Sequence, residues 1–311
     1  MAIRNFNDIV VIGSNMVDQI SKVMRFPSIG ETIIGSEYHI GFGGKGANQA
    51  VMASRLGASV SMITKVGSDL FGPMTIENFK NQGIEVDYVF TAPNSSSGVA
   101  PIWVDENGRN KIIIVPGANM LLNSVDVLEA EELIKNSKIV ISQLEIPNEA
   151  IEEGFRIAKA ASVLTILNPA PARPVPQSII DLTDIIIPNE TEAELLTGIK
   201  VNGLDGVKEA SQKLFEMGIK RIIITLGADG AFYYDQSGST HFPSPAVNVI
   251  DTTGAGDAFI GSLAFAISKK AKLNDAVEFA NICASLSVTK IGTQISFPTL
   301  DEVNKNLKIS F

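Results

Sequence analysis

Short runs of β-branched residues that end abruptly in polar or glycine residues recur along the chain. Four such runs, at 9–12, 139–141, 185–187 and 222–224, are followed by Gly13, Ser142, Pro188 and Thr225. Runs this uniformly apolar are typical of strands buried on both faces of a parallel sheet. Helical periodicity lies between them, as at 151–160 and at 207–217, where Gly218 is a helix stop. The alternation predicts an α/β fold: a doubly wound, mostly parallel sheet flanked by helices.

Two stretches interrupt this alternation. Residues 20–40 mix turn-forming Pro and Gly with β-type residues, and residues 98–115 alternate in polarity around Asn107-Gly108, a strong hairpin signal. We interpret both as strands outside the main sheet that form a small β lid. The expected lid segments are about 17–43 and 97–117.

Composition supports one compact domain over 1–311 and narrows the function. Of the 311 residues 45% are hydrophobic, which predicts a sizeable core, and no repeat of 20–50 residues divides the chain. The net charge of −9 argues against an extended nucleic-acid surface. Cys283 is the only cysteine, which excludes an internal disulfide and a multi-cysteine zinc site. Without a basic, apolar start or an apolar run of ~18 residues, we expect a cytoplasmic protein that binds no membrane.

Polar and glycine residues follow each predicted strand. In a parallel sheet, ligands bind beyond the carboxyl ends of the strands. The segments placed there are 13–18, 143–145, Asn168, 189–194 and 225–230. A ring of this kind is more than solubility requires, so it predicts a ligand site.

The segment 251–257 reads Asp-Thr-Thr-Gly-Ala-Gly-Asp and precedes an apolar pattern at helical spacing. Gly254 and Gly256 let the backbone turn tightly near a ligand, and the first amides of a helix attract anions. Asp257 in that position is a candidate base for an attacking hydroxyl in phosphoryl transfer. Read alone, the segment fits a capping aspartate after a glycine turn better.

A second glycine-rich segment, 41–50, places Lys45 and Asn48 beside a bare backbone. Gly41-x-Gly43-x-x-Gly46 matches a dinucleotide fingerprint, but no convincing acidic residue follows ~20 positions later. A Walker-type phosphate loop fails because the Lys precedes the last glycine. What remains is a loop able to hydrogen-bond a polyhydroxyl ligand, or a tight packing turn.

Two further segments are ambiguous when read alone. Asn189 and Glu192 are three residues apart and face one side of a helical turn. They suit water-mediated contact with a phosphate-bound Mg²⁺, or they complement a helix N-terminus. Residues 225–230 turn through two glycines and fit a nucleotide loop or an ordinary hairpin.

Together, segments 43–50, 168–172, 188–192 and 251–257 resemble the signatures of the ribokinase-like carbohydrate kinase family, and the resemblance spans essentially the whole chain. It implies that Asp257 is the catalytic base, with an anion hole of backbone amides at 254–256. It implies a sugar site of Met16, Asp18, Gly44, Lys45, Gly46, Ala47, Asn48, Glu145 and Asp257.

The same resemblance implies where ATP, Mg²⁺ and a monovalent cation bind. The ATP site would comprise Asn189, Glu192, Thr225, Leu226, Gly227, Ala228, Asp229, Gly230, Gly254, Ala255, Gly256 and Asn281, with Glu192 acting through Mg²⁺. The cation, usually K⁺ in the family, would be held by Asp251, Thr253, Ser287, Lys290, Gly292 and Ser296, several of them through backbone carbonyls. The resemblance also implies a homodimer through the β lid, in which Ala100 and Ile102 reach the partner's sugar site.

One departure from the family pattern bears on the substrate. Many bacterial members have Asn two residues before the sugar-binding Asp, whereas this chain has Met16 before Asp18. Met cannot replace an amide that hydrogen-bonds a sugar hydroxyl, so it would discriminate less against a sugar that lacks this hydroxyl. Some family members that act on ribose also carry Met here.

The hypothesis from the sequence is an ATP-dependent kinase that phosphorylates the 5-hydroxyl of D-ribose and gives ribose 5-phosphate. Alternatives on the same fold are 2-deoxy-D-ribose or another sugar or nucleoside. Two alternatives of other classes are a nucleotide-binding oxidoreductase built on 41–46 and a sugar-sensing protein without catalysis. The intact Asp257 argues against the latter.

Overall fold

The main sheet of the computed structural model, which describes residues 7–306, has the predicted parallel core. Its nine strands lie in the order β13-β12-β11-β10-β9-β8-β1-β4-β5. Every pairing from β11 to β5 is parallel, and β12 and β13 add an antiparallel edge. The strands are β1 (Ile9–Ile12), β4 (Val60–Gly67), β5 (Ile84–Ala92), β8 (Ile139–Gln143), β9 (Leu164–Asn168), β10 (Ile185–Ile186), β11 (Arg221–Thr225), β12 (Ala231–Asp235) and β13 (Gly238–Phe242).

Helices cover both faces of this sheet, so the doubly wound fold is confirmed. Alternate residues of β1 belong to different cores: Ile9 and Val11 pack on one face, Val10 and Ile12 on the other. The first face carries α1 (Lys45–Arg55), α2 (Phe71–Asn81), α9 (Ala255–Ser268), α10 (Leu273–Ser287) and α11 (Leu300–Asn306). The second carries α3 (Ser124–Glu129), α4 (Glu131–Lys135), α5 (Asn148–Ala160), α6 (Gln177–Asp181), α7 (Glu190–Thr197) and α8 (Gly203–Glu216). Short 3₁₀ turns are η1 (Gly117–Leu121), η2 (Gly227–Asp229) and η3 (Gln294–Ser296).

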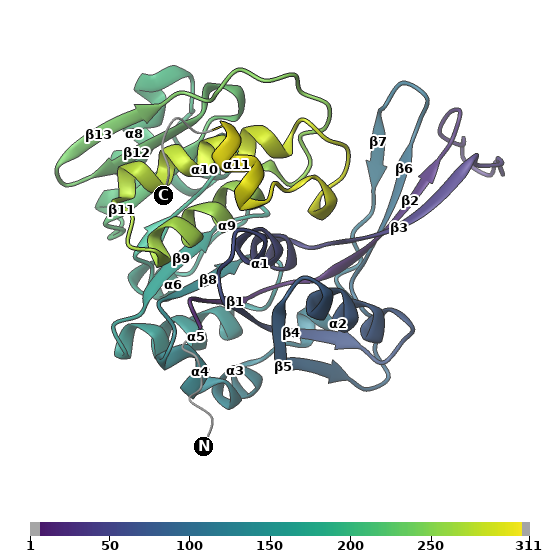
Figure 1. Cartoon of the computed structure of the whole chain (residues 1–311), viewed down its shortest axis with the longest axis horizontal. Helices are drawn as coiled ribbons and strands as arrows, with labels where there is room; N and C mark the ends of the chain where they lie inside the picture. Colours follow the sequence, from purple (N-terminus) through teal and green to yellow (C-terminus); the bar gives the residue numbers. More distant parts are fainter. Residues whose placement is uncertain (1–6, 307–311) are drawn as a thin grey trace.

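A second sheet of four strands, in the order β3-β2-β6-β7, forms the expected lid. It consists of β2 (Met16–Lys22), β3 (Glu37–Gly43), β6 (Val99–Val104) and β7 (Asn110–Ile112). The β6–β7 hairpin turns at Gly108, whose φ of +75° only glycine adopts easily. Figure 1 shows these strands projecting from the main body as a long arm.

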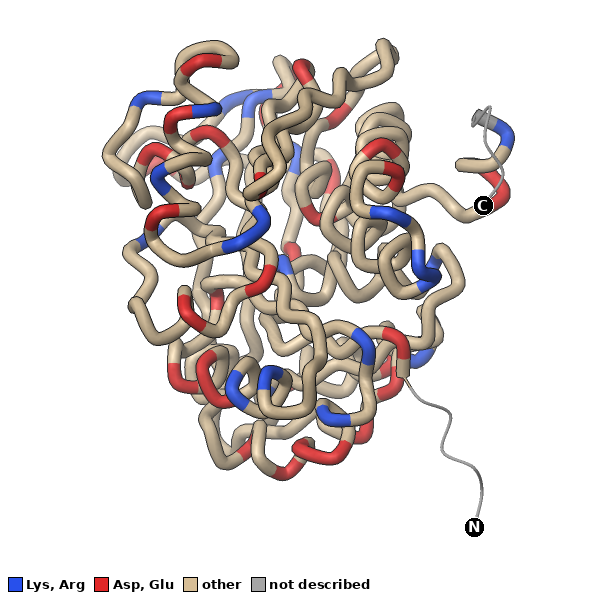
Figure 2. The backbone as a smooth tube through the Cα atoms, turned by 90° about the vertical axis from the view of Figure 1, so that its left-hand side faces the viewer, with Lys and Arg blue, Asp and Glu red and all other residues tan. Residues whose placement is uncertain are grey.

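Charged residues are distributed over the molecule with both signs interspersed, as the side seen in Figure 2 shows. Among the described residues, no helix is long and apolar enough to cross a membrane.

Candidate active site

A cavity of about 180 Å³ lies at the carboxyl ends of the central strands. Asn168 closes β9, Asn189 follows β10 and Thr225 closes β11, as the ring of polar strand ends predicts. The cavity is lined by Lys45, Asn168, Ala170, Ile187, Asn189, Glu192, Thr225, Thr252, Gly254, Ala255, Gly256, Asp257 and Ile260. It thus joins three segments far apart in sequence: the start of α1, the strand ends and the start of α9.

Asp257 is the third residue of α9 and is 7% exposed. Its Oδ2 accepts from Asn48 Nδ2 (2.9 Å) and its Oδ1 accepts from Gln49 Nε2 (3.0 Å). The Ala255 amide donates to the Thr252 carbonyl (3.2 Å), but no side chain caps the helix at Gly254, so the next amides of the first turn, from Gly256 on, are available to an anion. A capping role for Asp257 is not what the structure shows, because its oxygens bond to α1.

Two glycines before Asp257 differ in what surrounds them. Gly254 has a φ of +77°, and a Cβ there would lie 2.5 Å from Thr293 Cγ2, so its absence of a side chain is needed for folding. A Cβ on Gly256 would meet nothing within 4 Å. Packing therefore explains why residue 254 is a glycine. It does not explain the glycine at 256, which instead suits a ligand that approaches the backbone from the cavity.

Buried charges of both signs face each other across this cavity. Burial raises the pKa of Asp257, although the Lys45 charge and the two amide donors oppose that rise. Burial alone would lower the pKa of Lys45, but the charges of Asp257, Glu145 and Glu192 raise it overall. Lys45 therefore stays cationic and supplies a positive charge to the lining of the cavity.

The predicted sugar-site carboxylates, Asp18 and Glu145, lie where the chain crosses from the body into the lid. Glu145 Oε2 accepts from Ser14 Oγ (2.5 Å) and from the Lys45 backbone amide (3.0 Å). Burial, with the neighbouring charge of Glu145, raises the pKa of Asp18 to about 6. Neither carboxylate has a cationic side chain bonded to it in the structure, and both retain acceptor capacity for hydroxyl groups.

The glycine run is partly explained by packing. A Cβ on Gly44, at φ +88°, would lie 2.8 Å from Asn15 Cα, and one on Gly46 would lie 2.7 Å from the Ser14 amide nitrogen. The run follows β3, which pairs only antiparallel with β2 in the lid. A dinucleotide fingerprint needs a parallel β-α-β unit, so this arrangement argues against the oxidoreductase alternative. Ala47, within the run, and Met16, which pairs with Gly43, are both buried.

Asn189 and Glu192 form a capping box at the start of α7. Asn189 Oδ1 accepts from the Glu192 amide (2.8 Å), and Glu192 Oε2 accepts from the Asn189 amide (2.9 Å). The helix-terminus interpretation therefore describes their present contacts, yet both also line the cavity. Burial raises the pKa of Glu192, while the Asn189 amide and the Lys45 charge lower it.

The loop 225–230 is the β11–β12 hairpin, as the simpler interpretation of that segment has it. Thr225 reaches the cavity, and Gly227, at φ +54°, has nothing within 4 Å of a Cβ position. Asn281, on α10, donates from Nδ2 to the Phe242 carbonyl (2.9 Å). The lining of the cavity does not include Leu226, Gly227, Ala228, Asp229, Gly230 or Asn281.

The predicted cation segment forms a compact turn behind the start of α9. Asp251 Oδ1 accepts from the Thr253 amide and hydroxyl (2.9 and 2.6 Å), and its Oδ2 accepts from the Gly292 amide (2.9 Å). The side chains of Ser287 and Ser296 donate to nearby carbonyls, and Lys290 Nζ lies 2.7 Å from Glu302 Oε1. Any ligand role of Lys290 thus falls to its backbone carbonyl.

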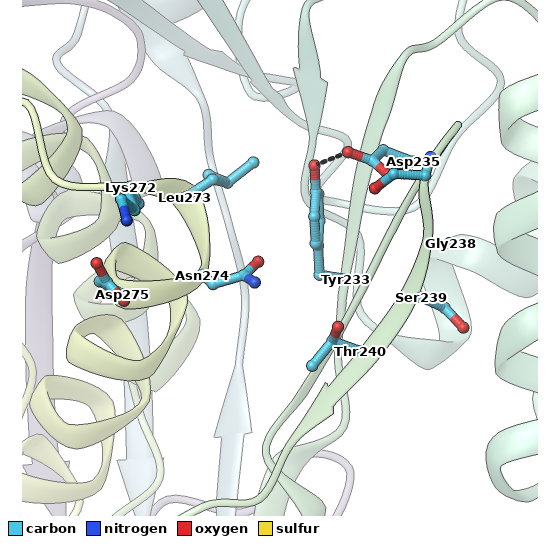
Figure 3. Close-up of a pocket in the computed structure, with 10 residues that line it drawn as sticks. Tyr233, Asp235, Gly238, Ser239, Thr240, Lys272, Leu273, Asn274 and Asp275 are labelled. Carbon is cyan, nitrogen blue, oxygen red and sulfur yellow. Dashed lines mark hydrogen bonds between the residues drawn. The ribbon is translucent and has the colours of Figure 1, made fainter.

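A larger hollow of about 580 Å³ lies away from this centre, between the β12–β13 hairpin and the start of α10. Figure 3 shows one hydrogen bond among its lining residues: Tyr233 donates to Asp235 across 2.6 Å. Asp235 also accepts from the Ser237 hydroxyl. Asp257 and Lys45 are absent from its lining, so we assign the chemistry to the smaller cavity.

The sequence analysis gave no role to several polar side chains of the site. Gln49, fully buried, donates to Asp257, and Thr252 lines the cavity. A signal for Gln49 was present, because it is a polar residue between buried apolar positions of α1. Nothing local in the sequence marks Gln294, which bonds to Asn48 from 246 residues away.

Comparison with known proteins agrees with this geometry. Residues 7–300 match the model of the "pfkB family carbohydrate kinase". A ribokinase of Staphylococcus aureus is 43% identical over 301 residues, covering 96% of this chain and 99% of its own length. A deoxyribokinase of Salmonella typhi is 41% identical over 304 residues, covering 97% and 99%.

Solved structures extend the agreement to three dimensions. The structure of an Arabidopsis thaliana ribokinase complexed with ribose and ATP superposes with a TM-score of 0.92, at 32% identity, over 98% of this chain and 100% of that one. A buried carboxylate at a helix N-terminus beside a lysine, on this fold and over this length of match, leads to one conclusion. The chain belongs to the pfkB family of carbohydrate kinases.

Proposed function

We propose that this protein transfers the γ-phosphoryl group of ATP to the 5-hydroxyl of D-ribose, with Asp257 as the general base. The observation that carries the proposal is the buried Asp257 carboxylate at the uncapped start of α9, with Lys45 lining the same cavity. A hydroxyl placed against Asp257 loses its proton as it attacks, and the α9 amides stabilise the charge on the transferred group.

The residues around the cavity fit a nucleotide triphosphate. Gly256 leaves its amide accessible, and Lys45 supplies a permanent positive charge beside it. Within residues 7–306, no group of three or more His, Cys, Asp and Glu is placed to hold a metal ion. Mg²⁺ would therefore take most of its ligands from phosphate oxygens and water, with Glu192 contributing through water. When bound, the ion neutralises phosphate charge.

The sugar would lie between Asp18, Glu145 and the start of α1. Asp18 and Glu145 accept hydrogen bonds from hydroxyl groups, and both lie at the lid crossing rather than at the cavity of the nucleotide. In this proposal the two substrates would bind on opposite sides of Asp257. Such a division is what direct transfer between them requires.

We further propose that a monovalent cation binds at the turn of Asp251 and Gly292. The hydrogen bonds that Asp251 accepts from Thr253 and Gly292 join two loops at this point. Burial works against ionisation of Asp251, but these bonds keep its pKa below the ordinary value, so it remains a carboxylate. A cation held by this carboxylate and by carbonyls of the 287–296 segment would stabilise the turn that shapes the anion site.

We also propose that the protein forms a homodimer through the lid. Large apolar side chains are exposed on it, including Tyr38, Ile40, Trp103 and Ile112. Apolar surface gathered on a projecting sheet is typical of a protein–protein interface. A second lid packed there would bring Ala100 and Ile102 near the partner's sugar site.

One observation favours 2-deoxy-D-ribose as the alternative substrate. Met16 is 4% exposed, and Asn119 Nδ2 contacts its sulfur at 3.7 Å. A thioether offers a sugar hydroxyl no donor and only a weak acceptor. The side of the site formed by Met16, next to Asp18, therefore suits a sugar carbon without a hydroxyl as well as one that carries a hydroxyl.

A coupled assay of ADP release tests the proposal with ribose, 2-deoxyribose and fructose, with and without K⁺. Asp257→Asn should lower kcat by about 10²–10⁴-fold and leave ATP binding largely intact. Asp275→Asn, in the larger hollow of Figure 3, is the matched control and should leave turnover unchanged. Near-normal turnover of Asp257→Asn would remove Asp257 from its role. A kcat/KM for 2-deoxyribose equal to or above that for ribose would favour the alternative substrate.

A further inference from the structure

The carboxylate of Asp257 is held by side-chain amides on both of its oxygens. Asn48 Nδ2 bonds one and Gln49 Nε2 bonds the other, and both donors come from the first turns of α1. An ionised carboxylate only accepts hydrogen bonds. The nitrogen of each amide must therefore face Asp257, and each amide oxygen must face away.

Those outward oxygens are held in turn by a second pair of amides. Gln143 Nε2 donates to Gln49 Oε1 (2.7 Å), and Gln294 Nε2 donates to Asn48 Oδ1 (3.1 Å). Asn78 Nδ2, on α2, then donates to Gln294 Oε1 (3.1 Å). Every amide in the two arms donates toward Asp257, so two buried chains of hydrogen bonds converge on one carboxylate.

The direction of the chain is maintained at a cost. Gln143 is fully buried, and its Oε1 accepts no hydrogen bond. A buried acceptor without a partner destabilises a protein. Gln143 is nevertheless oriented with its nitrogen toward Gln49, which is the orientation that the carboxylate at the end of the chain requires.

Gln294 itself lies outside the cavity but is fixed to the body. Its backbone carbonyl accepts from Arg55 Nη1 (2.7 Å), and Arg55 Nη1 also donates to the Phe297 carbonyl (3.0 Å). The end of α1 thereby anchors the 294–297 segment, while the side chain of Gln294 reaches Asn48 at its beginning. The second arm is thus rigid at both ends.

We propose that Gln294 and Gln143 are positioning residues, which act through Asn48 and Gln49 to fix the orientation of the Asp257 carboxylate. Neutral amides suit this task because they donate hydrogen bonds to the carboxylate but do not transfer a proton to it. The inference rests on the proposed role of Asp257 as the base. It adds that residues outside the cavity set the angle at which this base meets the hydroxyl.

Gln294→Glu tests the chain with almost no change in volume. A glutamate carboxylate cannot donate to Asn48 Oδ1, so Asn48 must turn its amide and present its oxygen to Asp257. Misorientation of the base should lower kcat by about 10–100-fold, while KM for ATP and sugar changes less than about threefold. Loss of the Asn48 hydrogen bond, which lowers the pKa of Asp257, should also move the acidic limb of the kcat/KM profile to higher pH.

Gln82→Glu is the matched control. Gln82 Oε1 accepts from the same Arg55 (3.2 Å), so the variant adds an equal charge in the same neighbourhood without touching the amide chain. Its kcat and pH profile should match those of the wild type. Gln143→Leu removes the donor of the other arm and, if Gln294→Glu does not fold, decides the question through kcat alone.

Three outcomes overturn the proposal: a folded Gln294→Glu with wild-type kcat and pH profile, an equal shift in Gln82→Glu, or full kcat in Gln143→Leu. Failure of the proposed function itself is recognised separately, because the wild-type protein would then release no ADP in response to sugar.

Discussion

The substitution Gly256→Ala tests whether Gly256 is needed for folding or for contact with a ligand. Gly256 is the second residue of α9, and a Cβ there meets no protein atom within 4 Å. Alanine is favoured over glycine in a helix by about 0.5–1 kcal/mol. With an unfolding entropy of ~2.1 cal/mol/K per residue, this corresponds to a rise in melting temperature of about 1–2 °C.

Activity should move in the opposite direction. A phosphate oxygen that bonds the Gly256 amide lies about 2.9 Å from its nitrogen, whereas a methyl carbon keeps other atoms about 3.5 Å away. We expect the phosphoryl group to pack against the Gly256 backbone within this distance of the Cβ position, so the added methyl would displace it from its donor. Removing one donor of an oxyanion site costs about 10²–10³-fold in kcat, and we expect a loss of at least tenfold in kcat/KM for ATP.

Thermal unfolding monitored by fluorescence and the coupled ADP assay measure the two effects on one preparation. Gly254→Ala is the contrasting variant: at φ +77° it adds backbone strain of about 1–2 kcal/mol, and its Cβ collides with Thr293. It should melt at a lower temperature than the wild type. A Gly256→Ala protein with undiminished kcat/KM would refute the anion site at this amide, and one that melts earlier would refute the account of its surroundings.

Four other predictions concern the sugar site, the core and the cation. KM for the sugar should rise about tenfold per pH unit below about 6, where Asp18 takes up a proton, and Asp18→Asn should abolish this dependence; a flat KM in the wild type would contradict it. In the sugar-free protein the folded state keeps the Asp18 proton that the unfolded chain releases near pH 4, so the free energy of unfolding should fall as pH rises from about 4 to 6, as denaturant titrations of wild type and Asp18→Asn would show. Gly46→Ala should destabilise the protein by about 1–3 kcal/mol in urea unfolding, because its Cβ would lie 2.7 Å from the Ser14 nitrogen; unchanged stability would mean that the backbone yields there freely. Asp251→Ala should bring the ratio of kcat with and without K⁺ close to one, and a preserved ratio would place the cation elsewhere.

The sequence predicted the layered fold well because periodicity is a local signal. The apolar runs at 9–12 and 139–141 became β1 and β8 of the sheet, and the polar residues after the strands converged as a parallel sheet requires. The short segments around Asn189 and Thr225 were ambiguous for a physical reason. A capping box and a hairpin satisfy their own hydrogen bonds, and only their place beside Asp257 gives them a second use.

The partners of Asp257 could not be predicted in the same way. Asn48, Gln49, Gln143 and Gln294 come from distant parts of the chain, and their contact depends on how α1 packs against α9 and η3. An amide at a buried position is an unusual residue in any sequence. Its hydrogen-bond partner depends on the tertiary structure, which the periodicity of the sequence does not predict.

The junction between the lid and the body has a mechanical consequence. Strand β3 ends at Gly43 and α1 begins at Lys45, so a single residue separates an element of the arm from the helix that grips Asp257. No slack loop lies between them in which a displacement of the arm would be absorbed. A displacement of the arm would therefore be transmitted to the start of α1, where Asn48 and Gln49 bond to Asp257. If the sugar binds against the arm as proposed, its arrival would be felt by the carboxylate that activates it.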